Sequence, residues 1–114
     1  MTDKAPVIIS SGIEAREKAL TGIMYAVNAV KYKWLEDVRL IFFGQSEKLI
    51  LSADDEIRGN MEFIRKVGLI PTACAAIARD EGLEPKLLEM GIKVEYVGSI
   101  ISSLIKDGYA VLTF

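Results

Sequence analysis

Residues 69–82 read LIPTACAAIARDEG, an apolar run followed at once by an alanine-rich run. The first run predicts a short strand over residues 69–73, and the second predicts a short helix that ends near Gly82. Cys74, the only cysteine of the chain, falls at the junction between the two. We therefore expect its thiol at the carboxyl end of a strand and near a helix N-terminus, where unpaired N–H groups and the helix dipole favour a thiolate.

A second interpretation of Cys74 stays open at this point. Cysteine outside a disulfide is among the most buried residue types, and it commonly packs as a small apolar side chain. The two interpretations differ in the exposure of the thiol. A reactive thiol is expected to be partly exposed, whereas a structural thiol is expected to be fully buried.

Strands and helices are predicted to alternate along the rest of the chain. Apolar runs predict four further strands, at residues 7–9, 38–43, 92–97 and 109–114. Helical spacing and helix-start residues predict helices near residues 11–32, 54–67, 84–90 and 99–106. This alternation is typical of an α/β protein, a three-layer α/β/α sandwich with a mostly parallel sheet, and we expect one domain over residues 1–114.

Three local signals refine the elements. Ser11, with Glu14 three residues later, predicts a capping box at the start of the first helix. Pro71 lacks the N–H that a strand donates, so the third strand should be short or lie close to the sheet edge. Charged residues alternate through residues 92–97, which also indicates an edge strand.

The first predicted helix carries few charges on the side opposite its main apolar face. That side consists of Ala19, Tyr25, Ala26 and Ala29. Apolar residues also make up 51% of the chain, a high share for 114 residues. Because a solvated helix face is normally polar, we expect this side to form the contact of a homo-oligomer.

Composition excludes several classes of function. The net charge of -2, without any Lys/Arg run longer than two residues, gives no surface for direct nucleic-acid binding. No apolar segment reaches the length of a membrane span or a signal-peptide core, so we expect no membrane association and a cytoplasmic protein. The chain has no histidine, which excludes Ser-His and Cys-His pairs and histidine metal sites. Phosphate-loop motifs are absent, and we expect no cofactor and no metal.

Small and hydroxyl-bearing residues follow the predicted strands. Because the carboxyl ends of parallel strands form one edge of a sheet, these residues should line a crevice there together with Cys74. The candidate substrate-binding residues are Ser11, Gly12, Gln45, Ala75, Ala76, Gly98 and Ser99. They would leave room and backbone N–H donors for a small anionic group, although glycine and serine are equally expected there as helix caps.

The charged residues are explained more simply by helix ends. The acidic residues 54–56 suit the start of a helix, and Asp80 with Glu81 suits an exposed helix end. Arg79 lies about one helical turn beyond Cys74, where it could meet an anionic substrate, but it is expected to be a surface side chain.

Several stretches together resemble the DsrE/DsrF-like sulfur-relay family. The central one is CAAIARDEG at residues 74–82 after an apolar strand. The others agree in order and spacing: KALTG and VNA at residues 18–22 and 27–29, FFG at 42–44, KLIL at 48–51, and GYAVLTF at 108–114. The resemblance covers nearly the whole chain.

This resemblance implies a five-stranded parallel sheet between helix layers and assembly into trimers or hexamers. It also implies that Cys74 carries a persulfide, which it receives from a donor protein and passes to an acceptor. Cys74 is the only residue that carries over as catalytic. The chain has no second cysteine to resolve a persulfide internally, so transfer must go to another protein or a small thiol.

Two main functions are therefore expected to compete. The first is a sulfur carrier or sulfurtransferase that acts through Cys74, which needs one accessible thiolate and no base, metal or cofactor. The second is a non-catalytic oligomeric binding or scaffold protein of the same fold. A redox sensor with disulfides between subunits is a third, weaker alternative.

Overall fold

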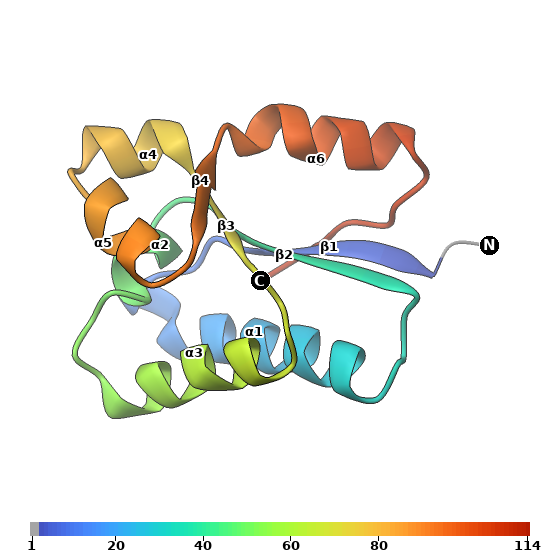
Figure 1. The fold of residues 1–114 in the computed structure, drawn as a ribbon, viewed down its shortest axis with the longest axis horizontal. Helices are drawn as coiled ribbons and strands as arrows, with labels where there is room; N and C mark the ends of the chain where they lie inside the picture. The colour runs from blue at the N-terminus through green and yellow to red at the C-terminus, as the bar shows by residue number, and fades with distance from the viewer. Residues whose placement is uncertain (1–2) are drawn as a thin grey trace.

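The computed structural model describes residues 3–114 of the protein (Figure 1). Its elements in chain order are β1 (Lys4–Ile9), a 3₁₀ turn (Ile13–Ala15), α1 (Arg16–Lys31), β2 (Asp37–Phe42), α2 (Ser46–Leu49), α3 (Asp55–Lys66), β3 (Thr72–Cys74), α4 (Ala75–Asp80), α5 (Glu84–Glu89), β4 (Lys93–Glu95), α6 (Val97–Lys106) and β5 (Leu112–Thr113).

The five strands form one sheet in the order β4-β3-β2-β1-β5. Every strand pair is parallel: β1 pairs with β2 and with β5, and β3 pairs with β2 and with β4. Parallel neighbours need a crossover between them, and helices supply those crossovers. The predicted α/β class and its mostly parallel sheet are therefore confirmed, and the sheet is parallel throughout.

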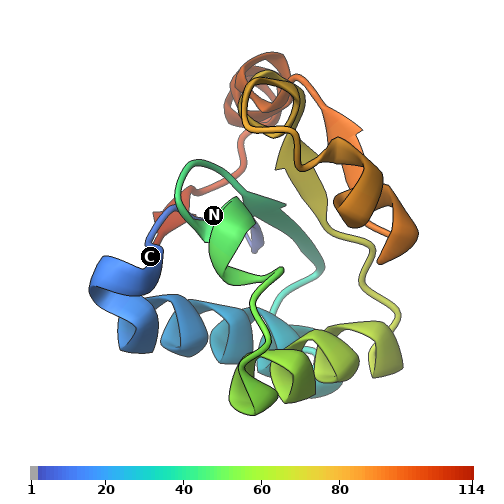
Figure 2. The same ribbon diagram turned by 90° about the vertical axis from the view of Figure 1, so that its left-hand side faces the viewer.

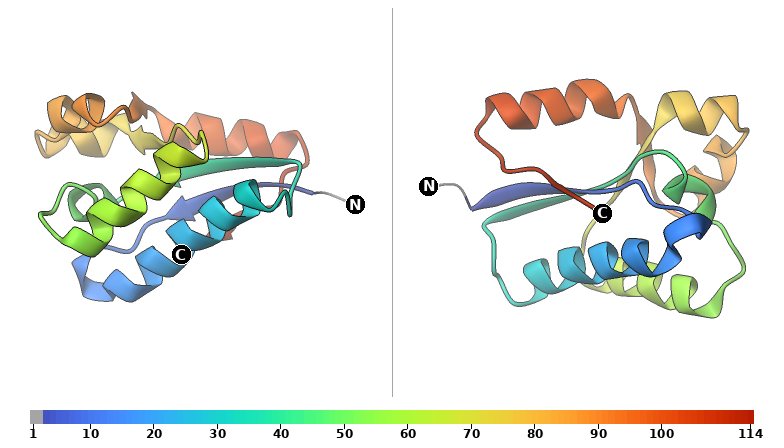
Figure 3. Two further views of the ribbon diagram at one scale, coloured as in Figure 1. Left: turned by 60° about the horizontal axis from the view of Figure 1, so that its bottom comes forward. Right: turned by 180° about the vertical axis from the view of Figure 1, so that it is seen from behind.

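Helices cover both faces of the sheet. α1 and α3 lie side by side on one face, while α4 and α6 lie on the other (Figures 2 and 3). Side chains alternate between these two layers along each strand. In β1, for example, Val7 and Ile9 face the large cluster under α1 and α3, whereas Ile8 faces a smaller cluster under α6. Each fully buried aliphatic side chain contributes roughly 1.5–3 kcal/mol to folding.

The second face of α1 does not form the oligomer contact that the sequence predicted. Ala19, Ala26 and Ala29 are fully buried within the chain, and Tyr25 is half-buried against the same cluster. The reason is that α1 packs against the sheet on one side and against α3 on another.

Two of the three predicted helix caps are wrong. No Ser11 capping box opens α1. A 3₁₀ turn precedes that helix, and the Glu14 carboxylate accepts a hydrogen bond of 2.9 Å from the N–H of Gly12. α6 begins at Val97, ahead of the predicted cap at Gly98 and Ser99. The acidic start of α3 is confirmed, because the Asp54 side chain accepts hydrogen bonds from the N–H groups of Glu56 and Ile57.

The predictions about sheet edges hold in part. β3 is only three residues long and lies beside the edge strand β4, but it starts at Thr72, so Pro71 precedes the strand instead of interrupting it. β4 is the predicted edge strand, with Lys93 and Glu95 exposed on either side of Val94. Within residues 3–114, no helix is both long and apolar enough to cross a membrane.

Candidate functional site

The turns that follow β1 and β2 are in direct contact. A Cβ atom on Gly12 would lie 2.6 Å from the Cβ of Gln45 and 3.0 Å from its carbonyl oxygen. Any larger residue at position 12 would therefore push the two turns apart. Of the residues predicted for the crevice, Gly12 and Gln45 are thus brought together.

The backbone donors of the turn after β1, which were expected to help hold an anion, are already used. The N–H groups of Ser10 and Ser11 both donate to the carbonyl oxygen of Phe114, at 2.8 and 3.3 Å. The N–H of Gly12 donates to Glu14, as described above. The sequence could not show this, because Phe114 reaches these groups through the pairing of β5 with β1. The prediction of open anion donors after β1 is wrong.

Ala75, Ala76, Gly98 and Ser99 lie on the other side of the site. Ala75 is buried in the first turn of α4, and Ala76 is exposed beside it. Gly98 and Ser99 are exposed at the start of α6, which follows the edge strand β4. In the strand order, β4 is separated from β2 by one strand and from β1 by two. The predicted residues therefore form two groups with Cys74 between them.

Cys74 ends β3 and is the N-cap residue of α4, as the sequence predicted. Its side chain points into the smaller apolar cluster, which contains Ile8, Ile41 and Val97. Only 6% of the residue is exposed, which is the burial expected of a structural thiol and contradicts the partial exposure expected of a reactive thiol. Strand alternation turns this side chain toward the α6 layer, and α6 covers it.

Glu47 is the residue of this region that the sequence analysis missed. It lies on the short helix α2, the next element after β2, and it is fully buried. Its Oε2 atom accepts a hydrogen bond of 3.3 Å from the N–H of Gly44, while its Oε1 atom has no hydrogen-bond partner among residues 3–114. The sequence offered one signal for Glu47: its carboxylate lies between the end of a predicted strand and the apolar run of residues 49–51. Only the tertiary structure shows that this position is buried.

Burial raises the pKa of the Glu47 carboxyl from its ordinary 4.5 to about 7. The N–H groups of Gly44 and Cys74 act in the opposite direction and lower this pKa, and the charge of Glu81 raises it further. Because the main-chain N–H of Cys74 lowers the pKa of Glu47, the Glu47 carboxyl lies beside the main chain of Cys74. A carboxyl with this pKa exchanges its proton near neutral pH, which suits acid–base chemistry.

The ion pairs around the site are peripheral. Lys48 and Glu81 pair at 2.6 Å and join α2 to the end of α4. Arg79 is exposed and donates to the Glu84 carboxylate and the Tyr96 hydroxyl, each at 2.9 Å. Arg79 is therefore a surface residue, as expected.

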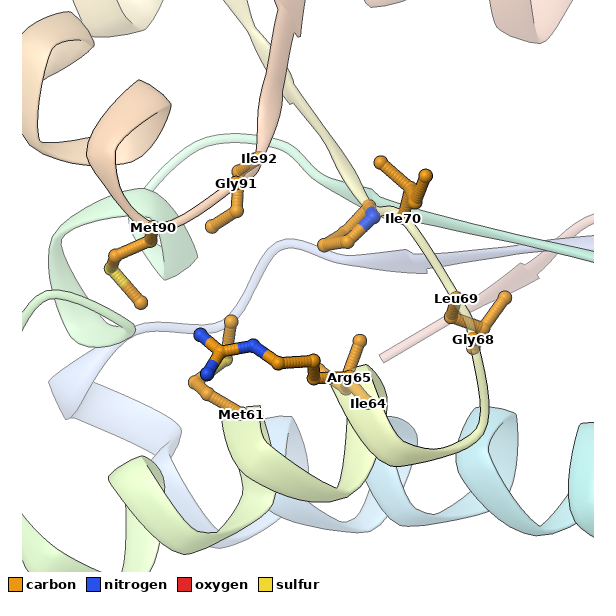
Figure 4. Close-up of a pocket in the computed structure, with 10 residues that line it drawn as sticks. Met61, Ile64, Arg65, Gly68, Leu69, Ile70, Met90, Gly91 and Ile92 are labelled. Carbon is orange, nitrogen blue, oxygen red and sulfur yellow. The ribbon is translucent and has the colours of Figure 1, made fainter.

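A pocket of about 320 Å³ lies away from Cys74, between α3 and the segment that leads into β4 (Figure 4). Its lining is mostly apolar and contains one cationic side chain. The lining residues are Met61, Ile64, Arg65, Gly68, Leu69, Ile70, Pro71, Met90, Gly91 and Ile92. None of the residues predicted for the crevice lines this pocket.

Two solved structures have the same architecture as this chain. No protein-family model and no curated protein matches the sequence. A conserved protein of unknown function from Bacteroides thetaiotaomicron, BT1422, superposes with a TM-score of 0.83 at 22% identity, covering 98% of this chain and 95% of that one. The YchN protein from E. coli superposes with a TM-score of 0.72 at 15% identity over 100% of both chains.

These likenesses establish the class of fold. The chain is an α/β protein with a five-stranded, all-parallel sheet and flanking helices, and it shares this fold with BT1422 and YchN. At such low identities the shared property is the fold, and the function has to be argued from the site itself.

Proposed function

We propose that the chain is a DsrE/DsrF-like carrier of sulfane sulfur, which holds sulfur as a persulfide on Cys74 and passes it to a partner protein. The observation that supports this proposal most directly is the place of Cys74 in the fold. The only cysteine of the chain ends a parallel strand, caps a helix and has a buried carboxyl beside its main chain. Ligand sites of parallel α/β sheets gather at these strand ends.

The chemistry requires only the thiolate. The Cys74 sulfur attacks the terminal sulfur of a donor persulfide, so that a new S–S bond forms while the S–S bond of the donor breaks. The donor sulfur leaves as a thiolate with the electron pair. In the second step, an acceptor nucleophile attacks the terminal sulfur of the Cys74 persulfide, and Cys74 leaves as the thiolate.

The chain must hand its sulfur to another molecule, because it contains no second cysteine. We include in the proposal a cytoplasmic homo-oligomer, a trimer or hexamer, that meets separate donor and acceptor proteins. Several large apolar side chains support an assembly because they are exposed in the single chain. They include Ile13, Trp34, Ile70, Leu88 and Tyr96.

The test is intact-protein mass spectrometry after incubation with inorganic polysulfide, with Cys74→Ser as the matched variant. We expect a mass gain of whole sulfur atoms that disappears on reduction and is absent from the variant. Because Cys74 is only 6% exposed, loading should be slow in the folded protein and fast in urea. A folded protein that gains no sulfur while its urea-unfolded form does would contradict the proposal.

A second candidate function is a non-catalytic, oligomeric ligand-binding or scaffold protein of the same fold. Two observations favour it: Cys74 is buried, and the pocket in Figure 4 is separate from it. Arg65 extends from α3 along this apolar pocket, so the fitting ligand has an apolar body and one anionic group. Octanoate is a suitable probe. This function predicts octanoate binding that Arg65→Ala weakens and Cys74→Ser leaves unchanged.

A further inference from the structure

We propose that the outer side of α1 and α3 is a contact between two copies of this chain, which meet about a two-fold axis with their α1 helices antiparallel. This surface, the α1/α3 face, is defined by Glu17, Met24 and Lys31 on α1 and by Glu56, Phe63 and Lys66 on α3. The inference goes beyond the proposed function, because it does not involve Cys74. A trimer would lack this contact, whereas a hexamer of two trimers would contain it.

The first argument is the shape and exposure of the α1/α3 face. The two helices lie side by side, and no other element within residues 3–114 lies over their outer side (Figures 2 and 3). A hollow of about 770 Å³ between them adjoins a second of about 450 Å³. Both hollows are lined by Met24, Asn28 and Phe63, so they form one groove. Phe63 is 46% exposed in the single chain, and a second copy would cover this large apolar side chain.

The second argument is the distribution of charge along the groove. At one end, the Arg16 guanidinium donates hydrogen bonds to three carboxylates, those of Glu17, Asp54 and Glu56. One cation against three carboxylates leaves this end negative. Lys31 and Lys66 line the other end of the groove, and neither forms an ion pair with a residue of the described part of the chain. The groove therefore has a negative end and a positive end.

The spacing on α1 makes this charge pattern self-complementary. Met24 lies seven residues after Glu17 and seven before Lys31, and all three side chains line the groove. Seven residues make two helical turns, so Glu17 and Lys31 lie about 10 Å from Met24 along α1, in opposite directions. A two-fold axis across Met24 therefore brings Glu17 opposite the partner's Lys31, and it does so twice because the contact is isologous.

This pattern selects a second copy of the chain in one orientation. The two ends of the same groove supply both charges that the contact needs, and on α3 the same rotation turns Glu56 toward the end that carries the partner's Lys66. A parallel arrangement would place Glu17 against the partner's Glu17, and like charges that face each other across an interface oppose association. The antiparallel arrangement also places Met24 and Phe63, which line both hollows, at the centre of the contact.

The test is the dissociation constant of the assembly, measured by analytical ultracentrifugation of a dilution series. Glu17→Lys or Lys31→Glu alone places like charges opposite each other at both symmetric positions, so each should raise the dissociation constant at least about tenfold. An equimolar mixture of these two variants should restore association, because a mixed pair has opposite charges at both positions. Lys106→Glu makes the same charge change on α6, at the opposite face of the sheet, and should associate as the wild type does.

The mixture separates this contact from other occupants of the groove. Loss of association in both single variants without rescue in the mixture would overturn the inference, because only antiparallel copies pair position 17 with position 31. A wild type that stays monomeric, or single variants that associate as the wild type does, would overturn it as well. Persulfide loading is detected on the single chain by mass spectrometry, so the proposed function succeeds or fails separately from this contact.

A second measurement covers the case in which a charge variant does not fold. In the Cys74→Ser background, Met24→Cys supplies the only cysteine of the chain, and the two-fold axis places it beside its own copy. We expect it to form a disulfide-linked dimer on mild oxidation. Lys31→Cys in the same background should not cross-link, since its two copies would lie about 21 Å apart along the antiparallel helices, beyond the reach of a disulfide. Any other pattern of cross-linking would overturn the inference.

Discussion

Gly22 on α1 lies directly against Phe114, the residue that follows β5. A Cβ atom on Gly22 would lie 2.6 Å from the Cβ of Phe114 and 2.5 Å from the Cδ1 of Ile9. Phe114 cannot move aside, because its N–H donates to Ile8 and its carbonyl oxygen accepts from Ser10, both at 2.8 Å. Glycine at position 22 is therefore what lets α1 approach the sheet this closely.

We expect Gly22→Ala to lower the free energy of unfolding by about 1–2 kcal/mol. Overpacking a core typically costs about 1–3 kcal/mol, and the better helix propensity of alanine returns up to about 1 kcal/mol of that. Urea unfolding measures the change. Gly59→Ala on α3 is the control, since a Cβ there meets no atom of residues 3–114 within 4 Å and should stabilise the protein by about 0.5–1 kcal/mol. If the two variants change stability in the same direction, the close contact at Gly22 is refuted.

Glu47 should make stability depend on pH with an unusual sign. Its native pKa of about 7 lies above the ordinary 4.5, so the folded state binds the proton more tightly than the unfolded state. The contribution of Glu47 to stability is therefore full below pH 4.5 and is lost as the pH rises through 7. Relative to Glu47→Gln, the wild type should lose about 3 kcal/mol between pH 4 and pH 8, measured by urea unfolding. A constant difference between the two proteins would contradict this prediction.

Asp54 should make stability depend on pH with the opposite sign to Glu47. Hydrogen bonds from Arg16, and secondarily from the N–H groups of Ile57 and Glu56, lower its pKa from 3.8 to about 2. Its contribution to stability is therefore present above pH 3.8 and is lost as the pH falls through 2. Asp54→Asn keeps the N-cap acceptor but loses the charge, so we expect it to have a lower urea midpoint than the wild type at pH 6 and an equal one near pH 2. Asp54→Ala also loses the cap and should be less stable at both pH values.

Tyr109 holds the segment before β5 to the strand β2. Its hydroxyl donates a short hydrogen bond to Asp37, and this bond is the largest cause of the lowered pKa of the Asp37 carboxyl. We expect Tyr109→Phe to lower the free energy of unfolding by about 1 kcal/mol and to raise the pKa of Asp37, as followed by NMR. Tyr96→Phe removes only an exposed bond from Arg79 and should cost less than about 0.5 kcal/mol. An unchanged Asp37 titration in Tyr109→Phe would show that this hydrogen bond does not control the pKa of the Asp37 carboxyl.

Local patterns were sufficient for the elements of the fold. The β-branched run of residues 7–9 and the apolar run of residues 38–43 are long and clear, and both form buried parallel strands. Gly68 and Gly91 follow helices in left-handed backbone conformations, with φ of 81° at both, which is why the sequence located these helix ends well. Strand ends fixed by pairing were predicted less well, as at Thr72, because the partner strand decides where a ladder begins.

The sequence by itself determined the α/β class, the parallel sheet and the place of Cys74 at a strand–helix junction, because these follow from periodicities and turn residues within short stretches. Only the tertiary structure decided that α6 covers Cys74, that Phe114 takes the backbone donors after β1, and that Glu47 is buried beside the cysteine. Each of these facts depends on residues far apart in the chain. Burial and hydrogen-bond pairing at a site are set by such contacts, and no local pattern encodes them.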